Sequence, residues 1–462
     1  MKGNGLSAGS SAVLWADNAD MRTITRSGLA VIATAAVVVG GVVPGPSQAA
    51  TNPGRILGAG GVAWGPILMY NADGTYGVHL TANSFSSNTK GAEPNYKSMQ
   101  PSQSNTNVIA FASNRDEDGM RIFTMKVDGS GIRKVTVRDG AVNAQGFSAD
   151  DRGPVISPNG RQIAFISRRS GVMATPMNNA QDIFIVNSNG SGLRQVTVSQ
   201  TDGRADSYVR SVVWSPDGTK LAFRGTRLVL ENGNNVMREV LGFIKPDGTE
   251  ESHVVTNDCA GGAALDWRGN KVLYSYGGAV QGCQYNTDYL IRDVTSGATT
   301  VVKAESLQGA PNGDGAARLS PDARRVAFTT RNPAGGVDPS VLVTIGTDGT
   351  DRVAAPGQLE PGGWIWWAPG TAYAKPKSFT ISPKQVTIKR GKTLQLIPML
   401  KDAKGRTLSR SGADWTWAPG SSSNAIITTT GKLVTTKDTA PGVVMAQIGN
   451  GGLTAKVKIT IT

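Results

Sequence analysis

Six acidic residues are the side chains in this chain most suited to form a charged binding site. Each lies in a segment that joins one predicted β-sheet to the next: Glu93, Asp151, Asp206, Asp258, Asp314 and Glu360. If these segments meet around a common axis, the six carboxylates form a ring that can hold a cation or a basic ligand. A second interpretation stays open, because polar loops often contain an acid and because arginines are interspersed among these six, at Arg152, Arg204, Arg210 and Arg318.

Motifs for catalysis are weak. The one G-x-S-x-G, at residues 5–9, lacks the strand-turn-helix context of a nucleophile elbow. The two histidines, His79 and His253, each lie near the end of a repeat, where surface or packing roles are expected. We therefore expect a protein that is not an enzyme and that has no cofactor and no metal site. The alternative is an extracellular hydrolase or lyase with an atypical site in the funnel.

Two cysteines, Cys259 and Cys283, follow the predicted leader. In an oxidising compartment we expect them to form a disulfide. Metal binding by the pair is not expected, since the chain has no third cysteine and the one histidine near the pair, His253, belongs to the preceding repeat.

Turn signals reveal an internal repeat. The second turn of each repeat recurs at Asp73-Gly74, Asp128-Gly129, Asn189-Gly190, Asp247-Gly248, Ser296-Gly297 and Asp348-Gly349, in steps of 55, 61, 58, 49 and 52 residues. Asx-Gly favours the positive φ of tight hairpins, so these pairs are interpreted as turns and not as calcium loops. The most complete repeat, 211–256, contains four short apolar runs. Four strands in a period near fifty predict an all-β, six-bladed β-propeller.

The two ends of the array predict closure into a ring. Residues 64–81 resemble the last two strands of a blade, and residues 363–373 resemble the first two. A blade built from both ends removes the open sheet edges that favour aggregation. The longest segments between strands all belong to one face of the disc, which predicts the binding face. These segments are 114–119, 168–182, 225–238, 276–287 and 331–339.

The blades resemble the propeller repeats of TolB and its relatives. The resemblance rests on Ser-Pro-Asx at 157–159, 215–217 and 320–322, on the apolar cores that follow, and on closing Val-Thr pairs at 135–136, 196–197 and 255–256. It covers about two-thirds of the chain and implies a fold, not an activity. TolB carries a further domain before its propeller that is not recognisable here, so its role in the Tol system is not expected.

The start of the chain looks like a leader. Residues 21–49 have two arginines, an apolar run and a small-residue cleavage site, which predict a secretory signal peptide, and residues 1–20 are a possible misread start. The apolar run is short for a membrane span. We therefore expect residues 50–375 to form the propeller and residues 376–462 a second domain, in a protein of the extracellular space, periplasm or cell envelope.

Residues 376–462 resemble the group 2 bacterial immunoglobulin-like domains, a class of β-sandwich. A tryptophan followed by a Ser-rich turn, Gly431-Lys432-Leu433-Val434, Pro441-Gly442 and a closing alternating strand carry the resemblance. Ten lysines and three arginines against three aspartates give this segment +10 of the chain's +13. The expected binding residues for an anionic polymer are Lys384, Lys389, Arg390, Lys392, Lys401, Lys404, Arg406 and Arg410. A merely soluble cationic surface is an equally good interpretation.

The expected function is that of a secreted, non-catalytic binding or scaffold protein. Its loop-rich propeller face would bind a protein or carbohydrate, and its basic domain would attach it to an anionic envelope polymer. Nucleic acid is not an expected partner, because the basic stretch has no interleaved aromatic residues. We also expect a monomer without a membrane span in the mature chain.

Overall fold

The structure is a computed structural model. It describes residues 54–60, 65–81, 98–115, 119–137, 150–169, 181–198, 207–256, 265–276, 288–302, 317–331, 340–359, 361–413, 415–428 and 430–462. The predicted signal peptide, 21–49, and the segment before it lie outside these residues. The described residues belong to one compact unit. Among them, every regular element is a β-strand, and no helix is long and apolar enough to span a membrane.

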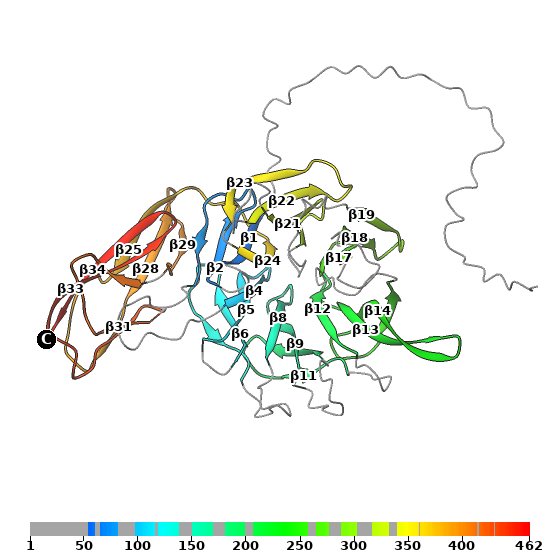
Figure 1. The fold of residues 1–462 in the computed structure, drawn as a ribbon, viewed down its shortest axis with the longest axis horizontal. Coiled ribbons are helices and arrows are strands. Elements are labelled where there is room, and N and C mark those ends of the chain that lie inside the picture. Colours follow the sequence, from blue (N-terminus) through cyan, green and yellow to red (C-terminus); the bar gives the residue numbers. More distant parts are fainter. Residues whose placement is uncertain are drawn as a thin grey trace, which may run out of the picture. The chain divides into compact units, whose positions relative to one another are not determined.

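Residues 55–368 form six four-stranded antiparallel sheets, each a meander of the kind found in propeller blades (Figure 1). Five use consecutive strands. The first three are β4 (Ser98–Gln103), β5 (Val108–Ser113), β6 (Arg121–Lys126), β7 (Arg133–Lys134); β8 (Asp151–Ile156), β9 (Gln162–Ser167), β10 (Asp182–Asn187), β11 (Arg194–Gln195); and β12 (Val209–Trp214), β13 (Leu221–Glu231), β14 (Asn234–Ile244), β15 (Ser252–Val255). The next two are β16 (Leu265–Arg268), β17 (Lys271–Tyr276), β18 (Asp288–Asp293), β19 (Thr299–Val302); and β20 (Arg318–Leu319), β21 (Arg325–Arg331), β22 (Ser340–Gly346), β23 (Val353–Leu359). The predicted repeat is confirmed.

The repeated turns have the expected geometry. The glycines of all six pairs have φ between 75° and 90°, within the left-handed region. The Asx side chain before the glycine accepts hydrogen bonds from the residue two positions on, as when Asp73 Oδ1 accepts Thr75 N at 2.9 Å and Thr75 Oγ1 at 2.7 Å. These oxygens are occupied within their turns, which agrees with the interpretation as hairpins.

The sixth sheet combines the two ends of the blade region, but not in the proportion predicted. It has the order β24 (Pro361–Ala368), β1 (Arg55–Gly60), β2 (Ile67–Asn71) and β3 (Val78–His79). One strand therefore comes from the far end and three from the near end, where two and two were expected. The Gly-rich lead-in was the missed strand: Arg55 to Leu57 pair in register with Ala368 to Trp366.

The first strands of neighbouring sheets are in contact with one another. β24 contacts β4, and the series continues through β8, β12, β16 and β20, which contacts β24 again. Hydrogen bonds join several of these pairs. On β12, for example, Trp214 Nε1 donates to the Val155 carbonyl oxygen of β8 at 2.9 Å. Between the sheets lie apolar side chains such as Phe111, Phe165 and Phe223, all fully buried.

One of the long segments predicted to be a loop is regular. Residues 225–238 continue β13 and β14 into a hairpin of eleven residues on each strand, paired from Leu221↔Ile244 to Glu231↔Asn234. Figure 1 shows this hairpin as a long green ribbon. The turn Asn232-Gly233 permits it, because both residues have the positive φ, 50° and 80°, that a tight two-residue hairpin requires.

Residues 376–462 form three small sheets. Their strand orders are β25-β28-β29, β26-β34-β33-β30 and β27-β32-β31. The strands are β25 (Pro376–Ser382), β26 (Gln385–Ile388), β27 (Thr393–Gln395), β28 (Ile397–Asp402), β29 (Thr407–Ser409), β30 (Trp415–Trp417), β31 (Ile426–Ile427), β32 (Lys432–Val434), β33 (Gly442–Asn450) and β34 (Leu453–Ile461). Strict alternation in β34 buries Ala455, Val457, Ile459 and Ile461 and exposes Lys456 and Lys458.

These C-terminal sheets are hydrogen-bonded to the blade region. The Asn450 side chain bonds both backbone groups of His79, each at 3.0 Å. Arg410 bonds Asp128 through its backbone N at 2.7 Å and its Nε at 3.0 Å. His79 is packed at this contact, as expected for a packing histidine, and burial lowers its pKa to about 4.

Candidate functional site: a cavity among the first strands of the sheets

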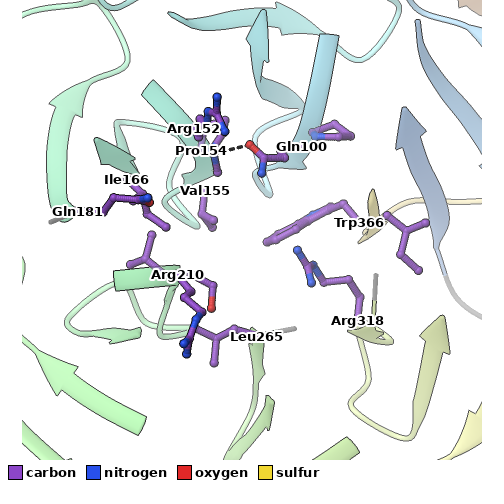
Figure 2. Close-up of a pocket in the computed structure, with 15 residues that line it drawn as sticks. Gln100, Arg152, Pro154, Val155, Ile166, Gln181, Arg210, Leu265, Arg318 and Trp366 are labelled. Atoms are coloured by element: carbon purple, nitrogen blue, oxygen red, sulfur yellow. Dashed lines mark hydrogen bonds between the residues drawn. The ribbon is translucent and has the colours of Figure 1, made fainter. Parts of the chain in front are cut away.

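The first strands of the six sheets enclose a cavity of about 310 Å³ (Figure 2). Its lining residues come from β4, β8, β9, β12, β16, β20 and β24 and from Gln181 just before β10. Apolar side chains form part of the wall, among them Val155, Val212 and Leu265. This volume is at the lower end of the range for small-molecule sites.

Three arginines from three different sheets are the charged residues of the described lining. They are Arg152 on β8, Arg210 on β12 and Arg318 on β20, and no acidic side chain is among the described lining residues. Arg152 is half-exposed and is paired with Asp150 at 2.7 Å. Beside it, the Gly153 backbone N donates to Gln100 Oε1 at 2.6 Å, which fixes the Gln100 amide at the cavity wall.

Arg210 is held in place by residues behind the cavity wall. Its Nη1 bonds Glu239 Oε2 at 2.5 Å, and its guanidinium also contacts the Tyr208 hydroxyl. The guanidinium carbon lies 4.5 Å from the Tyr208 ring centroid, a cation–π contact. Burial raises the pKa of Tyr208, so its hydroxyl stays protonated near neutral pH.

Trp366 and Arg318 form the corner of the cavity nearest β24. In Figure 2 the Trp366 indole extends into the cavity, and the Arg318 guanidinium lies beside it. Only 4% of Trp366 is exposed, and its Nε1 has no hydrogen-bond acceptor within the described structure. The Arg268 and Arg318 guanidinium carbons lie 5.3 Å and 5.5 Å from the centre of the indole ring.

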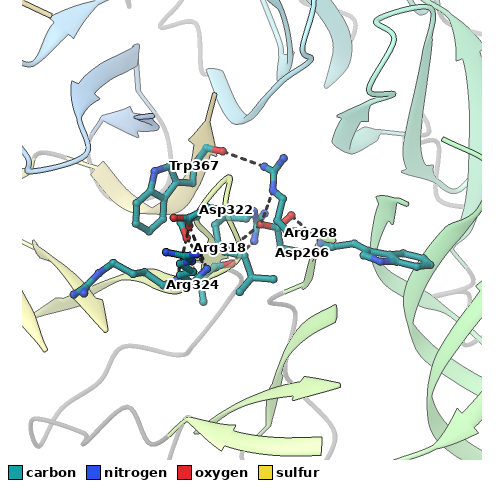
Figure 3. Close-up of polar contacts among 11 residues, drawn as sticks. Asp266, Arg268, Arg318, Asp322, Arg324 and Trp367 are labelled. Atoms are coloured by element: carbon teal, nitrogen blue, oxygen red, sulfur yellow. Dashed lines mark hydrogen bonds and ion pairs between the residues drawn. The ribbon is translucent and has the colours of Figure 1, made fainter. Parts of the chain in front are cut away.

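A buried polar network supports this corner (Figure 3). Asp266, fully buried, accepts the Leu319 backbone N at 2.9 Å, so it joins β16 to β20. Arg268 lies 3.5 Å from the same carboxylate and donates to the Trp367 carbonyl oxygen at 3.0 Å. Burial lowers the pKa of Arg318, Asp266 raises it, and the charge of Arg268 lowers it further.

Of the six predicted acids, the structure describes one. Glu93, Asp206, Asp258, Asp314 and Glu360 lie outside the described residues, so their ring stays a prediction. Asp151 is fully buried: Arg169 Nε bonds its Oδ1 at 2.7 Å, and Arg169 Nη2 and Thr136 Oγ1 each bond its Oδ2 at 2.6 Å. Asp151 is therefore engaged inside the fold, away from the position expected for a ligand-binding carboxylate.

The partners of two adjacent residues account for this difference. The residues of β8 that line the cavity run continuously from Arg152 to Val155, where the pairing with β9 shifts register, and Asp151 is just outside that stretch. When Asp151 turns inward to Arg169, the adjacent Arg152 turns to the cavity. The sequence showed Arg152, Arg210 and Arg318 near the predicted acids, but it could not decide which member of each pair reaches the axis.

Seven of the eight predicted basic residues of 376–462 fall into two groups, and Lys384 belongs to neither. Arg406 pairs with Asp402 at 2.7 Å and Arg410 with Asp128, and Lys401 and Lys404 lie near Arg406 in the sequence. Lys389, Arg390 and Lys392 belong to a second group, which we call the basic end together with Lys437, whose Cγ would lie 4.0 Å from a Cβ on Gly391. Lys389 and Lys392 are joined through Thr435 Oγ1, which contacts both carbonyl oxygens at 3.1 Å and 2.8 Å. Lys384 adjoins Lys458, whose backbone N bonds its carbonyl oxygen at 3.3 Å.

Cys259 and Cys283 lie outside the described residues, so their predicted disulfide stays a prediction. Groups of three or more potential metal ligands are absent from the described part of the chain.

Comparison with known proteins shows that this chain is similar to several of them in fold. No protein-family model and no curated protein matches the sequence. Among solved structures, a putative TolB from Agrobacterium tumefaciens is 14% identical with a TM-score of 0.39, over 58% of this chain and 86% of that one. An oligogalacturonate lyase from Vibrio parahaemolyticus is 11% identical with a TM-score of 0.36, over 60% of this chain and 82% of that one. The β-propeller domain of the Trilobed protease from Pyrococcus furiosus is 11% identical with a TM-score of 0.34, over 76% of this chain and 93% of that one.

These similarities concern the arrangement of four-stranded sheets. The activities named for those proteins are not transferred to this chain.

Proposed function

We propose that this chain is a secreted, non-catalytic binding protein, a six-bladed propeller that binds its ligand in the central cavity. The observation that carries this proposal is the cavity itself, whose wall takes residues from the first strand of every one of the six sheets. A ring closed by the sheet of β24 and β1 would give such a cavity a wall on all sides. Sites of this kind are common where several elements converge.

We further propose that residues 376–462 form an Ig-like sandwich that attaches the propeller to an anionic envelope polymer. The parallel pairing of β26 with β34 and the buried Trp415 support a sandwich. The basic end supports attachment, because none of Lys389, Arg390, Lys392 and Lys437 forms an ion pair with a described residue. Four such charges attract a polyanion through a field that salt screens.

A cavity-filling variant tests ligand binding. A panel of neutral, anionic and cationic saccharides and short peptides is screened by native mass spectrometry against the full chain and against Gln181→Trp. Gln181 lines the cavity without being part of a strand, so a larger side chain there can occupy the cavity. We expect bound members of the panel to be lost in Gln181→Trp and kept in Arg161→Trp, an exposed residue of the β8–β9 turn. Ligands that bind both variants equally would contradict the proposal, as would turnover of the panel by the wild type.

The attachment is tested by sedimentation of the full chain with purified cell walls at increasing salt. Substitution of Lys389, Arg390, Lys392 and Lys437 by Gln should lower the salt concentration of release. The charge-matched control replaces four lysines outside the basic end by Gln: Lys401, Lys404, Lys456 and Lys458. Equal loss in the control, or no binding of the wild type at low salt, would contradict the attachment.

A further inference from the structure

The chemistry of the cavity wall indicates what kind of ligand it takes, given the proposed function on which this inference rests. A guanidinium group has five N–H donors. Arg152 uses one of them on Asp150, and Arg210 uses two on Glu239 and Tyr208. The remaining donors of both side chains are available at the cavity wall, where they can bind an oxygen-rich group.

The corner at Trp366 adds a donor of a different kind. The Trp366 Nε1 is buried and has no acceptor. A buried donor without a partner is destabilising, so an acceptor oxygen brought to this atom would be bound favourably. Because the nitrogen is covered, a ligand reaches it with a small shift of the indole, whose ring already extends into the cavity (Figure 2).

Electrostatics at this corner favour an anion. Arg318 is the most buried of the three lining arginines whose side chains the structure describes, and a second guanidinium, Arg268, lies against the same indole. Burial and the charge of Arg268 both disfavour the protonated form of Arg318, and its pKa is lowered even though Asp266 acts in the opposite direction. A negative group beside Arg318 would offset both effects.

We propose that the cavity binds a carboxylate on a small apolar group, with the carboxylate held by Arg318 and the Trp366 indole N–H. The apolar part packs against Val155, Val212 and Leu265. A carboxylate is favoured over a dianion such as a phosphate monoester, because transfer into a partly apolar cavity costs more for a double charge. The volume of about 310 Å³ admits one side-chain-sized group with its carboxylate. This chemistry is shared by a free carboxylic acid and by the last residue of a peptide.

Four probes that share an isobutyl group, in two pairs of matched size, separate charge from size. Isothermal titration calorimetry of the full chain uses 4-methylpentanoate as the free acid and N-acetyl-L-leucine as the peptide terminus. N-acetyl-L-leucinamide is the neutral equivalent, and 4-methylpentylamine is the cation. We expect the acids to bind and the amide and the amine to bind at least about tenfold more weakly, as for a charge-assisted hydrogen bond. The tighter of the two acids identifies the source.

Variants then assign the contacts. Trp366→Phe keeps an aromatic ring and removes the N–H, so it should weaken acid binding several-fold while the protein stays folded. Arg318→Gln should weaken it about tenfold, and Arg161→Gln, on an exposed turn, should not change it. The inference is overturned if neither acid binds, if the amide or the amine binds as tightly as the acids, or if Trp366→Phe and Arg318→Gln both bind as the wild type does. Binding of the amine or the amide that Gln181→Trp abolishes would overturn this inference and leave the proposed function intact.

Discussion

Replacement of Asp151 by Asn should destabilise the fold and not merely weaken ligand binding. Both carboxylate oxygens lie in a buried network with Arg169 and Thr136, at 2.6 to 2.7 Å, and the side chains of Asp151 and Arg169 are 0% and 3% exposed. Asn presents an NH₂ group where Arg169 needs an acceptor and leaves a buried guanidinium without its described counter-charge. Removal of one member of such a pair costs about 3–5 kcal/mol.

Urea unfolding of the full chain, followed by tryptophan fluorescence, measures this loss. A double-mutant cycle with Arg169→Gln isolates the pair, and the double variant should lose less than the sum of the two single variants. Glu231→Gln is the control, because Glu231 pairs with Arg238 at 2.6 Å on the exposed hairpin and should change stability little. A loss below about 1 kcal/mol for Asp151→Asn would refute the reasoning and return Asp151 to the candidates for ligand binding.

Three further outcomes are expected. Stability should fall as the pH falls from about 6.5 to about 4, because burial lowers the folded-state pKa of His79 from 6.5 to about 4 and the unfolded chain therefore binds the proton first. The urea midpoint of His79→Gln should depend less on pH across this range than that of the wild type. An unchanged pH dependence would contradict the assignment. Gly129→Ala should destabilise the protein more than Gly218→Ala in the same denaturation assay: both have positive φ, at 77° and 73°, but a Cβ on Gly129 would lie 2.3 Å from the Leu80 carbonyl oxygen, whereas the nearest atom to one on Gly218 is at 3.7 Å. Non-reducing peptide mapping of secreted protein should find Cys259 joined to Cys283, and two free thiols would disprove the pairing.

The fold was largely predictable from local signals. Asx-Gly pairs such as Asp247-Gly248 fix tight turns through their φ and their side-chain bonds, and alternating apolar runs fix the strands between them. Both effects act over a few residues, so their repetition was visible in the sequence. The strand at Arg55–Gly60 was missed because its partner, β24, lies about three hundred residues away and its own composition is rich in glycine.

The binding site was less predictable, because it depends on which side of a strand each residue faces. The sequence determined that acids and arginines occur together near the first strands, as at Asp151 and Arg152. The tertiary structure decided that Asp151 pairs with the buried Arg169 and that Arg152 lines the cavity. The buried ion pair engages the acid and leaves the adjacent arginine as the charged group at the cavity wall, and its other member, Arg169, is 18 residues further along the chain.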